Sequence, residues 1–326
     1  MKGAAMRTHR IIRIGVALGL WALAGCALAQ AYPSRPVRVL IPYGPGSGID
    51  VVVRMLNEAL GKNLGQSFVA ENRAGAAGTI AAAFVASQPP DGYTILSDSS
   101  SHTIIPSLRP NMPFDTAKDF AGVTTLIENP LVLVVARSRG INTLQELIAA
   151  GKAKPGSITY ASAGVGTTTH ISAEKFRIGA GIEGLHIPFK SSTDGLAEVM
   201  AGRIDFTYTA LASAQSGIRD GRIVALAMVS KRVAVMPEVP AVDEIVPNAG
   251  YSTWLGIMVP AKTPRDIVMR LNQEIIKAMT TPEMKDRMAK LGTEPWTMSP
   301  DEFDALRRKE LVDNERLVKA AGIKMQ

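Results

Sequence analysis

The chain has 326 residues, of which 46% are hydrophobic, 20% charged and 5% aromatic, and its formal net charge is +7. Its length suggests roughly two domains and is sufficient for a sizeable buried core. The composition excludes a disordered chain, a collagen-like fibre and a disulfide-stapled mini-protein. Cys26 is the single cysteine, so no intramolecular disulfide can form.

The first 29 residues are laid out as a secretory signal peptide. Four basic residues and no acid precede an apolar run over 14–25, and Ala27-Leu28-Ala29 is a small-x-small cleavage site. Cleavage after Ala29 leaves 32 basic against 29 acidic residues, a net charge of +3 that gives nucleic-acid binding little support. Residues 23–26 also fit a lipobox, so a leader of 1–25 with a lipid anchor at Cys26 is the alternative. Both predict an exported protein. No later segment reaches the roughly 18 apolar residues of a membrane span.

After the leader, short apolar runs alternate with segments of helical spacing. We expect strands near 37–42, 68–71, 93–96, 131–136, 158–161, 185–189, 204–208, 223–229 and 254–259. We expect helices near 50–61, 79–87, 143–151, 169–176, 193–201, 264–280 and 300–321. Thr143 or Asn142 is expected to cap the third helix, and Pro264 and Pro282 fit helix starts. The alternation predicts an α/β fold with largely parallel sheets in two units, and a single large sheet is the alternative.

Three polar turns follow predicted strands. The turn at 43–50 contains Gly44-Pro45-Gly46-Ser47-Gly48 and leads into a helix, so its free N–H groups can form an anion site. The other two are the serine cluster at 99–102 and the turn at 162–170, whose hydroxyls can cap a helix or donate to a carboxylate. Ordinary tight turns and simple capping are the alternative interpretation of each. Three donor-rich turns at the carboxyl ends of parallel strands fit the general position of a ligand crevice.

Sequence motifs for nucleotide binding and catalysis fail. Ile49 stands where a dinucleotide fingerprint needs its last glycine, and Ser47 lacks the flanking glycines of a nucleophile elbow. His170 and Glu174 are spaced i, i+4, but a catalytic metal site needs three ligands. No nucleophile–base pair can be assembled, so we expect no metal, no cofactor and no enzymatic activity.

Seven motifs in order resemble the exported solute receptors of tripartite tricarboxylate transporters, also called the Bug family. They cover nearly the whole chain from residue 32 onward. They are PSRP followed by PYGPGSGID (33–50), ENRAGAAGTIAA (71–82), PDGYTIL (90–96), SSSH (99–102), LQELIAAGKAKPGSITYASAGVGTTTH (144–170), HIPFKSSTDGLAEVMAGRIDF (186–206) and WLGIMVPAKTPRDIV (254–268).

The resemblance implies a two-domain periplasmic binding protein-like fold of class II, with the ligand cleft between the domains. Residues 32–127 plus 254–326 would form the first domain and 128–253 the second. The implied function is a periplasmic receptor, a monomer, that captures a small organic carboxylate and delivers it to a two-subunit membrane permease. The same fold acting as a sensor for a signalling partner is the alternative, followed by an exported enzyme acting on organic acids.

The resemblance also implies that backbone amides and hydroxyls of the cleft loops hold the carboxylate. Carried onto this chain, the ligand-binding residues are Tyr43, Gly46, Ser47, Gly48, Ile49, Asp50, Ser99, Ser100, Ser101, His102, Ala163, Gly166, Thr167, Thr168, His170, Phe189, Lys190, Ser191 and Asp205. The chain departs from the family pattern at Ser47, at Ile49 and at Phe189-Lys190-Ser191. Ile49 replaces a hydroxyl residue of the family pattern, and Phe189 replaces a tyrosine. Both changes predict a less polar pocket, so we expect a monocarboxylate with an apolar or aromatic body.

Overall fold

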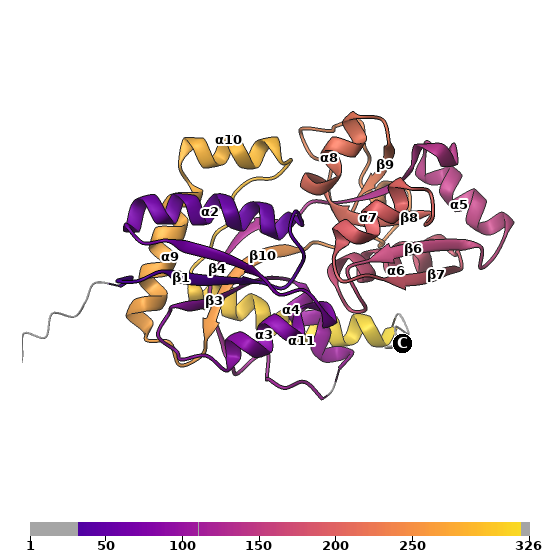
Figure 1. Ribbon diagram of the computed structural model, residues 1–326. Coiled ribbons are helices and arrows are strands. Elements are labelled where there is room, and N and C mark those ends of the chain that lie inside the picture. The colour runs from indigo at the N-terminus through magenta and orange to yellow at the C-terminus, as the bar shows by residue number, and fades with distance from the viewer. Residues whose placement is uncertain (1–31, 110, 321–326) are drawn as a thin grey trace, which may run out of the picture. The chain divides into compact units, whose positions relative to one another are not determined.

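The computed structural model describes residues 32–109 and 111–320, apart from the side chain of Ala320. The predicted leader and Cys26 lie outside the described residues. Within those two ranges, no helix combines the length and the apolar character that a membrane crossing requires. The chain divides at Ser34, and the unit that begins at Arg35 contains two five-stranded sheets (Figure 1).

The first sheet has the strand order β2-β1-β3-β10-β4. Its strands are β1 (Val37–Ile41), β2 (Phe68–Asn72), β3 (Thr94–Ser99), β4 (Phe120–Glu128) and β10 (Trp254–Pro260). Strand β1 pairs in parallel with β2 and β3, whereas β10 pairs antiparallel with β3 and β4.

Helices cover both sides of this sheet. Figure 1 shows α2 on one side and α3, α4 and α11 on the other. Their bounds are α2 (Gly48–Leu64), α3 (Thr79–Ala86), α4 (Ser101–Ile104), α9 (Arg265–Met279), α10 (Pro282–Lys290) and α11 (Pro300–Ala320), with short 3₁₀ turns at Ala76–Gly78 and Ile105–Ser107. Because α9 contacts α2 and β4, and α11 contacts β4, the C-terminal helices pack on this first sheet.

The second sheet has the strand order β7-β6-β8-β5-β9. Its strands are β5 (Leu131–Ala136), β6 (Ile158–Ser162), β7 (Gly184–Pro188), β8 (Phe206–Ala210) and β9 (Ile223–Met228). Its helices are α5 (Leu144–Ala153), α6 (Thr168–Ala180), α7 (Ser192–Met200) and α8 (Leu211–Arg219), with 3₁₀ turns at Arg137–Arg139 and Val242–Glu244. Strand β6 is parallel to β7 and β8, whereas β5 is antiparallel to β8 and β9.

Strand β5 shows why its sequence is apolar throughout. Leu131, Leu133 and Val135 pack in a core cluster with residues of α5 and α6, whereas Val132 and Val134 pack in a second cluster with residues of α7 and α8. Alternate side chains of a strand point to opposite faces, so a strand covered by helices on both faces reads as a continuous apolar run. The strand predicted from LVLVVA is confirmed at 131–136.

The prediction of largely parallel sheets is wrong. Both sheets are mixed, because β5 and β10 each run against their two neighbours. Each of these strands enters its sheet after the chain has crossed from the other sheet, by 129–130 in one case and by 229–253 in the other. Strand β4 and helix α8 were not predicted as elements. Helix α10 begins at Pro282, which the sequence indicated as a helix start without a range for the helix. The predicted cap of α5 is confirmed, since Thr143 and Glu146 form a capping box.

Candidate functional site: a cavity at three helix starts

A small cavity lies where loops of the two sheets meet, with a volume of about 30 Å³. The first loop contributes Tyr43, Ser47, Gly48 and Ile49; strands β3 and β10 and the first crossover contribute Ser99, Leu255 and Asn129. The second sheet and its helices contribute Leu131, Ala163, Thr167, Thr168, Thr169, Ser192 and Ala210. None of the lining side chains is formally charged.

The start of α2 presents unused hydrogen-bond donors. Ser47 is the N-cap residue, but its side chain makes no capping hydrogen bond. Its hydroxyl is buried without a partner among the described residues, and the residue is 3% exposed. The N–H groups in the first turn of a helix have no intrahelical acceptor. Ser47 and the first turn of α2 therefore offer donors to a ligand.

Asp50 supports this turn rather than lining the cavity. Its carboxylate accepts hydrogen bonds from the Gly46 N–H at 2.9 Å, from Arg54 Nε at 3.0 Å and from Asn72 Nδ2 at 2.9 Å. Burial alone would raise the pKa of Asp50, but the hydrogen bonds from Arg54, Gly46 and Asn72 hold it below its ordinary value. The ionised carboxylate thus fixes the path of the glycine-rich turn.

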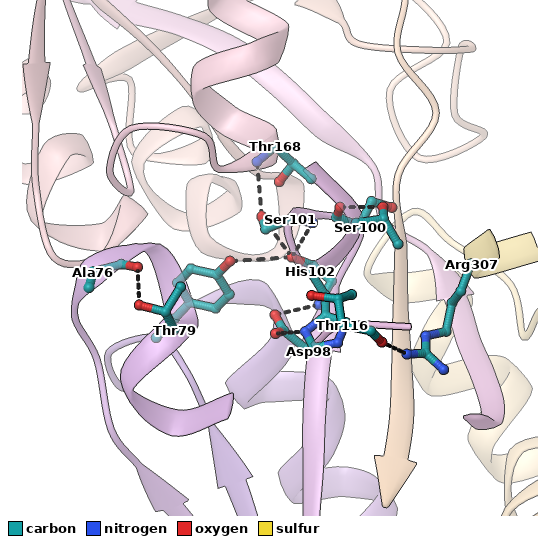
Figure 2. A network of polar contacts seen from close by, with 12 residues as sticks. Ala76, Thr79, Asp98, Ser100, Ser101, His102, Thr116, Thr168 and Arg307 are labelled. Atoms are coloured by element: carbon teal, nitrogen blue, oxygen red, sulfur yellow. Dashed lines mark hydrogen bonds and ion pairs between the residues drawn. The ribbon is translucent and has the colours of Figure 1, made fainter. Parts of the chain in front are cut away.

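The serine cluster connects the first sheet to the start of α6. The Thr168 N–H donates to Ser101 Oγ at 3.0 Å, as Figure 2 shows, and Ser99 Oγ donates to Ser101 Oγ at 3.0 Å. The Tyr43 hydroxyl lies 3.3 Å from Ser99 Oγ. Burial, with a contribution from the nearby Asp98, raises the pKa of Tyr43, so its phenol stays protonated. Tyr43 and Ser99 thus line the cavity, and Ser101 connects them to the start of α6 from outside the lining.

The start of α6 uses its own hydroxyls for capping. Thr167 Oγ1 accepts from the His170 N–H at 3.4 Å and donates to the Gly164 carbonyl at 2.7 Å. Thr169 Oγ1 accepts from the Ala163 N–H at 3.0 Å. Helix α7 begins at Ser192, which also lines the cavity. Three helix N-termini, those of α2, α6 and α7, therefore meet at a cavity that contains no cationic side chain. Helix N-termini carry partial positive charge and bind anions.

Apolar groups form the rest of the lining. Ile49, Leu131, Ala210 and Leu255 are each at most 5% exposed. The first loop approaches the end of β8 so closely that a Cβ added to Gly48 would lie 2.4 Å from the Cβ of Ala210. The φ angle of Gly48 lies outside the left-handed region that favours glycine. The requirement for glycine at this position therefore comes from the close approach alone. The cavity thus combines polar donors with an apolar side.

Other residues implicated by the sequence lie around the cavity or away from it. Gly46, Asp50, Ser100, Ser101, His102, Gly166, His170, Phe189, Lys190, Ser191 and Asp205 are not among the lining residues. Phe189 packs against the cluster of Ala161, Val199 and Ile204. Lys190 is exposed. The Asp205 carboxylate accepts from Thr159 and pairs with Arg139 at 2.9 Å.

Six lining residues were not singled out from the sequence. They are Asn129, Leu131, Thr169, Ser192, Ala210 and Leu255. Thr169 and Ser192 lie inside the motifs at 144–170 and 186–206, beside residues assigned to the site, and both stand at helix starts. Leu255 lies inside the motif at 254–268 but has no polar group to indicate a site. Asn129 stands in a crossover and Ala210 at a strand end, and neither carries a local signal.

The histidines are buried and hold loops in place. His170 Nδ1 accepts from the Gly166 N–H at 3.1 Å, and its ring stacks on His186 with centroids 4.0 Å apart. Burial lowers the pKa of His170 to about 4 and that of His186 to about 3. Glu174 accepts hydrogen bonds from Tyr160 and Arg177. Over 32–109 and 111–320, no group of three potential metal ligands is present.

The fold and this cavity define a solute-binding protein of the periplasmic binding protein type. The chain belongs to the tripartite tricarboxylate transporter receptor family, TctC, whose profile matches residues 52–323. It is 31% identical over 323 residues to the protein BugT of Bordetella pertussis, covering 98% of this chain and 99% of BugT.

Solved structures agree with this assignment. The fold is similar to that of R. palustris Rpa4515 with adipate, with a TM-score of 0.87, 29% identity, and coverage of 90% of this chain and 99% of that chain. It is also similar to MatC from Rhodopseudomonas palustris with bound malate, with a TM-score of 0.83, 27% identity, and coverage of 88% and 100%. The predicted family and fold class are confirmed.

Proposed function

We propose that this protein is a periplasmic receptor that binds a small organic carboxylate in the cavity described above. The carrying observation is Ser47, which begins α2 with a buried hydroxyl that has no partner in the described part of the chain. That hydroxyl and the first turn of α2 face a cavity at which two further helices start. A carboxylate is the anion that such hydroxyl and N–H donors hold well.

The comparisons support this class of ligand. Relatives of the same fold carry adipate in one case and malate in another. We further propose that a two-subunit membrane permease receives the ligand, because the family is described as a transporter receptor. Export by the leader at 1–29, or at 1–25 with a lipid anchor, belongs to the same proposal, as does a monomeric receptor rather than an enzyme.

The apolar side of the cavity favours a monocarboxylate with an apolar or aromatic body. Ile49, Leu131, Ala210 and Leu255 offer no partner to a second carboxylate, which would be costly to bury unpaired. At about 30 Å³ the cavity has room for only one or two water molecules. Binding of such a ligand therefore requires the loops to separate and close again. We propose that residues 32–127 with 254–326 and residues 128–253 are the two parts that move.

The test is a thermal-shift screen of the chain from residue 30, followed by calorimetry. Matched pairs separate charge from shape: benzoate against benzamide, and hexanoate against adipate and malate. We expect a monocarboxylate to raise Tm while its amide does not, because a ligand that binds only the folded state stabilises it by mass action.

Two outcomes contradict parts of the proposal. Tighter binding of a diacid than of every monocarboxylate would overturn the ligand class and leave the carboxylate receptor standing. A sample that native mass spectrometry shows to be free of retained ligand, and that responds to no acid, would overturn the receptor function itself.

A further inference from the structure

A second cavity, larger than the carboxylate cavity, lies near the two crossovers. It has a volume of about 320 Å³. Its lining comes from Glu128 at the end of β4, Pro130 of the first crossover, 230–234 of the second crossover, Ala289 of α10 and 292–294 after α10. This volume lies in the range of small-molecule sites, roughly 300–1,000 Å³. None of its lining residues belongs to the set that lines the carboxylate cavity.

Specific contacts hold its walls together. Thr293 Oγ1 donates to the Glu128 carbonyl at 2.8 Å, and Gln215 Nε2 of α8 donates to the Lys290 carbonyl at 2.7 Å. Gly292 has a φ of +76°, and a Cβ there would lie 2.6 Å from Leu211 Cδ2. The segment after α10 is therefore seated against α8 of the second sheet, and the cavity depends on that seating.

The charged side chains around this cavity form two ion pairs. The Glu128 carboxylate accepts from Ser230 Oγ at 3.2 Å and pairs with Lys231 at 2.9 Å. The Arg232 guanidinium pairs with Glu244 at 2.7 Å. The Glu294 side chain is exposed and makes no hydrogen bond or ion pair within the described residues. Lys231, although paired with Glu128, also interacts electrostatically with Glu294. Counted together, Glu128, Glu244 and Glu294 against Lys231 and Arg232 give this region a net charge of −1.

We propose that this cavity is a second ligand site, for a small amphipathic organic cation. The apolar body would lie against Pro130, Val233 and Ala289, and the ammonium group would lie beside the Glu294 carboxylate. The apolar lining supplies affinity through burial, and the net negative charge of the region favours a cation over an anion.

An occupant of this site would also act on the first cavity. It touches both crossovers and the contact between α10 and α8, so it favours the arrangement of the two sheets seen here. This step rests on the proposed function, because it requires carboxylate binding to favour the same arrangement. Such a coupling is reciprocal, so each ligand would tighten the other.

The experiment uses 2-phenylethylamine as the probe, with 2-phenylethanol as its neutral analogue, in calorimetric titrations of the exported chain. We expect the amine to bind more tightly than the alcohol by about two- to fivefold, the effect of one exposed charge pair. Glu294→Gln should remove that preference while leaving the weaker apolar binding. Ala289→Phe, at an exposed lining position, should abolish binding of both compounds by filling the cavity.

Ala153→Phe is the matched control, because Ala153 is an exposed alanine at the end of α5, a helix that contributes no residue to this lining. It should bind the amine as the unmodified chain does. Absence of amine binding to the unmodified chain, or equal binding to Ala289→Phe, would overturn the site. Amine binding that leaves carboxylate affinity unchanged would overturn the coupling alone. Failure of every carboxylate with intact amine binding would count against the proposed function and not against this site.

Discussion

At the scale of single residues, Ser47 is distinguished by what its hydroxyl does not do. An N-cap serine normally accepts a hydrogen bond from the N–H two or three residues on, and loss of that bond costs about 1 kcal/mol. Ser47 makes no such bond, whereas Thr167 caps α6 through the His170 N–H. The Thr167 hydroxyl therefore caps its helix, whereas the Ser47 hydroxyl is left available for a ligand.

Ser47→Ala and Thr167→Ala should separate ligand binding from helix capping. A hydrogen bond to a charged group contributes about 1.5–3 kcal/mol, so Ser47→Ala should weaken carboxylate binding about tenfold or more. Its Tm should stay nearly unchanged, because no bond within the protein is lost. Thr167→Ala should lower Tm through the lost cap. Calorimetry and thermal unfolding measure the two effects, and a Ser47→Ala protein with full affinity would contradict the assigned role.

At the scale of elements, the approach of the first turn of α2 to the end of β8 limits how far the loops can close. A methyl group at Gly48 would meet the Ala210 methyl at 2.4 Å, a separation that real Cβ atoms do not reach. The position of a Cβ atom is fixed by the backbone, so neither methyl group can rotate away from the other. An alanine at position 48 must therefore push the two elements apart.

Gly48→Ala should weaken carboxylate binding about fivefold or more while the two sheets stay folded, because overpacking of a tight contact costs about 1–3 kcal/mol. The matched control is Gly61→Ala, in the interior of the same helix, where the nearest atom to an added Cβ is 3.6 Å away. That control should bind normally and be slightly more stable. Calorimetry, with small-angle scattering on the ligand-saturated proteins, measures both. Equal affinity in Gly48→Ala would show that this contact does not limit closure.

The elements also show which parts of the fold are readable from sequence. Buried strands such as β5 and amphipathic helices such as α9 carry their period in their own residues. Strand β4 was missed because Thr124 and Thr125 interrupt its apolar pattern; they are buried because neighbouring segments satisfy them, as when Thr124 Oγ1 accepts from the Met298 N–H. The direction of β5 and β10 depends on crossovers and has no local signal.

The same reasoning explains the site. The donor-rich turns predicted Ser47, Ser99 and Thr168 as site residues, because glycine and serine beside a helix start indicate hydrogen-bond donors from the local sequence alone. Asn129, Ala210 and Leu255 come together only when both crossovers have brought the sheets into contact. Sequence alone therefore predicts the donors of this cavity better than its apolar side, which is the side that selects the body of the ligand.

At the scale of the whole molecule, the buried histidines link pH to global stability. His170 and His186 stack inside the second sheet's packing, beside the ion pair of Glu174 and Arg177. Burial holds their pKa values at about 4 and about 3, whereas an unfolded chain has a histidine pKa of about 6.5. Both are neutral in either state above pH 6.5, so the stability that they contribute is complete there.

As pH falls below 6.5, the unfolded chain takes up protons that the folded chain does not. The free energy of unfolding should therefore fall, by up to about 1.4 kcal/mol per pH unit for each histidine, until the folded pKa is reached. Carboxylates with lowered pKa, such as Glu174, lose their contribution only at lower pH. Burial raises the pKa of Glu310, so the histidine effect is isolated by comparing two proteins that share this carboxyl group.

His170→Gln tests this directly, since glutamine keeps an acceptor for the Gly166 N–H but does not titrate. Urea unfolding at pH 7.5, 6.5, 5.75 and 5 should give a shallower loss of stability in the variant than in the unmodified chain. Both proteins share the same carboxylates, so the effect of the carboxylates cancels in the comparison. A uniform cost of the substitution lowers the free energy of unfolding equally at every pH, so it does not change the slope. Parallel pH profiles would mean that His170 can take up a proton without leaving the folded state, and the loop at Gly166 would then be the part that yields.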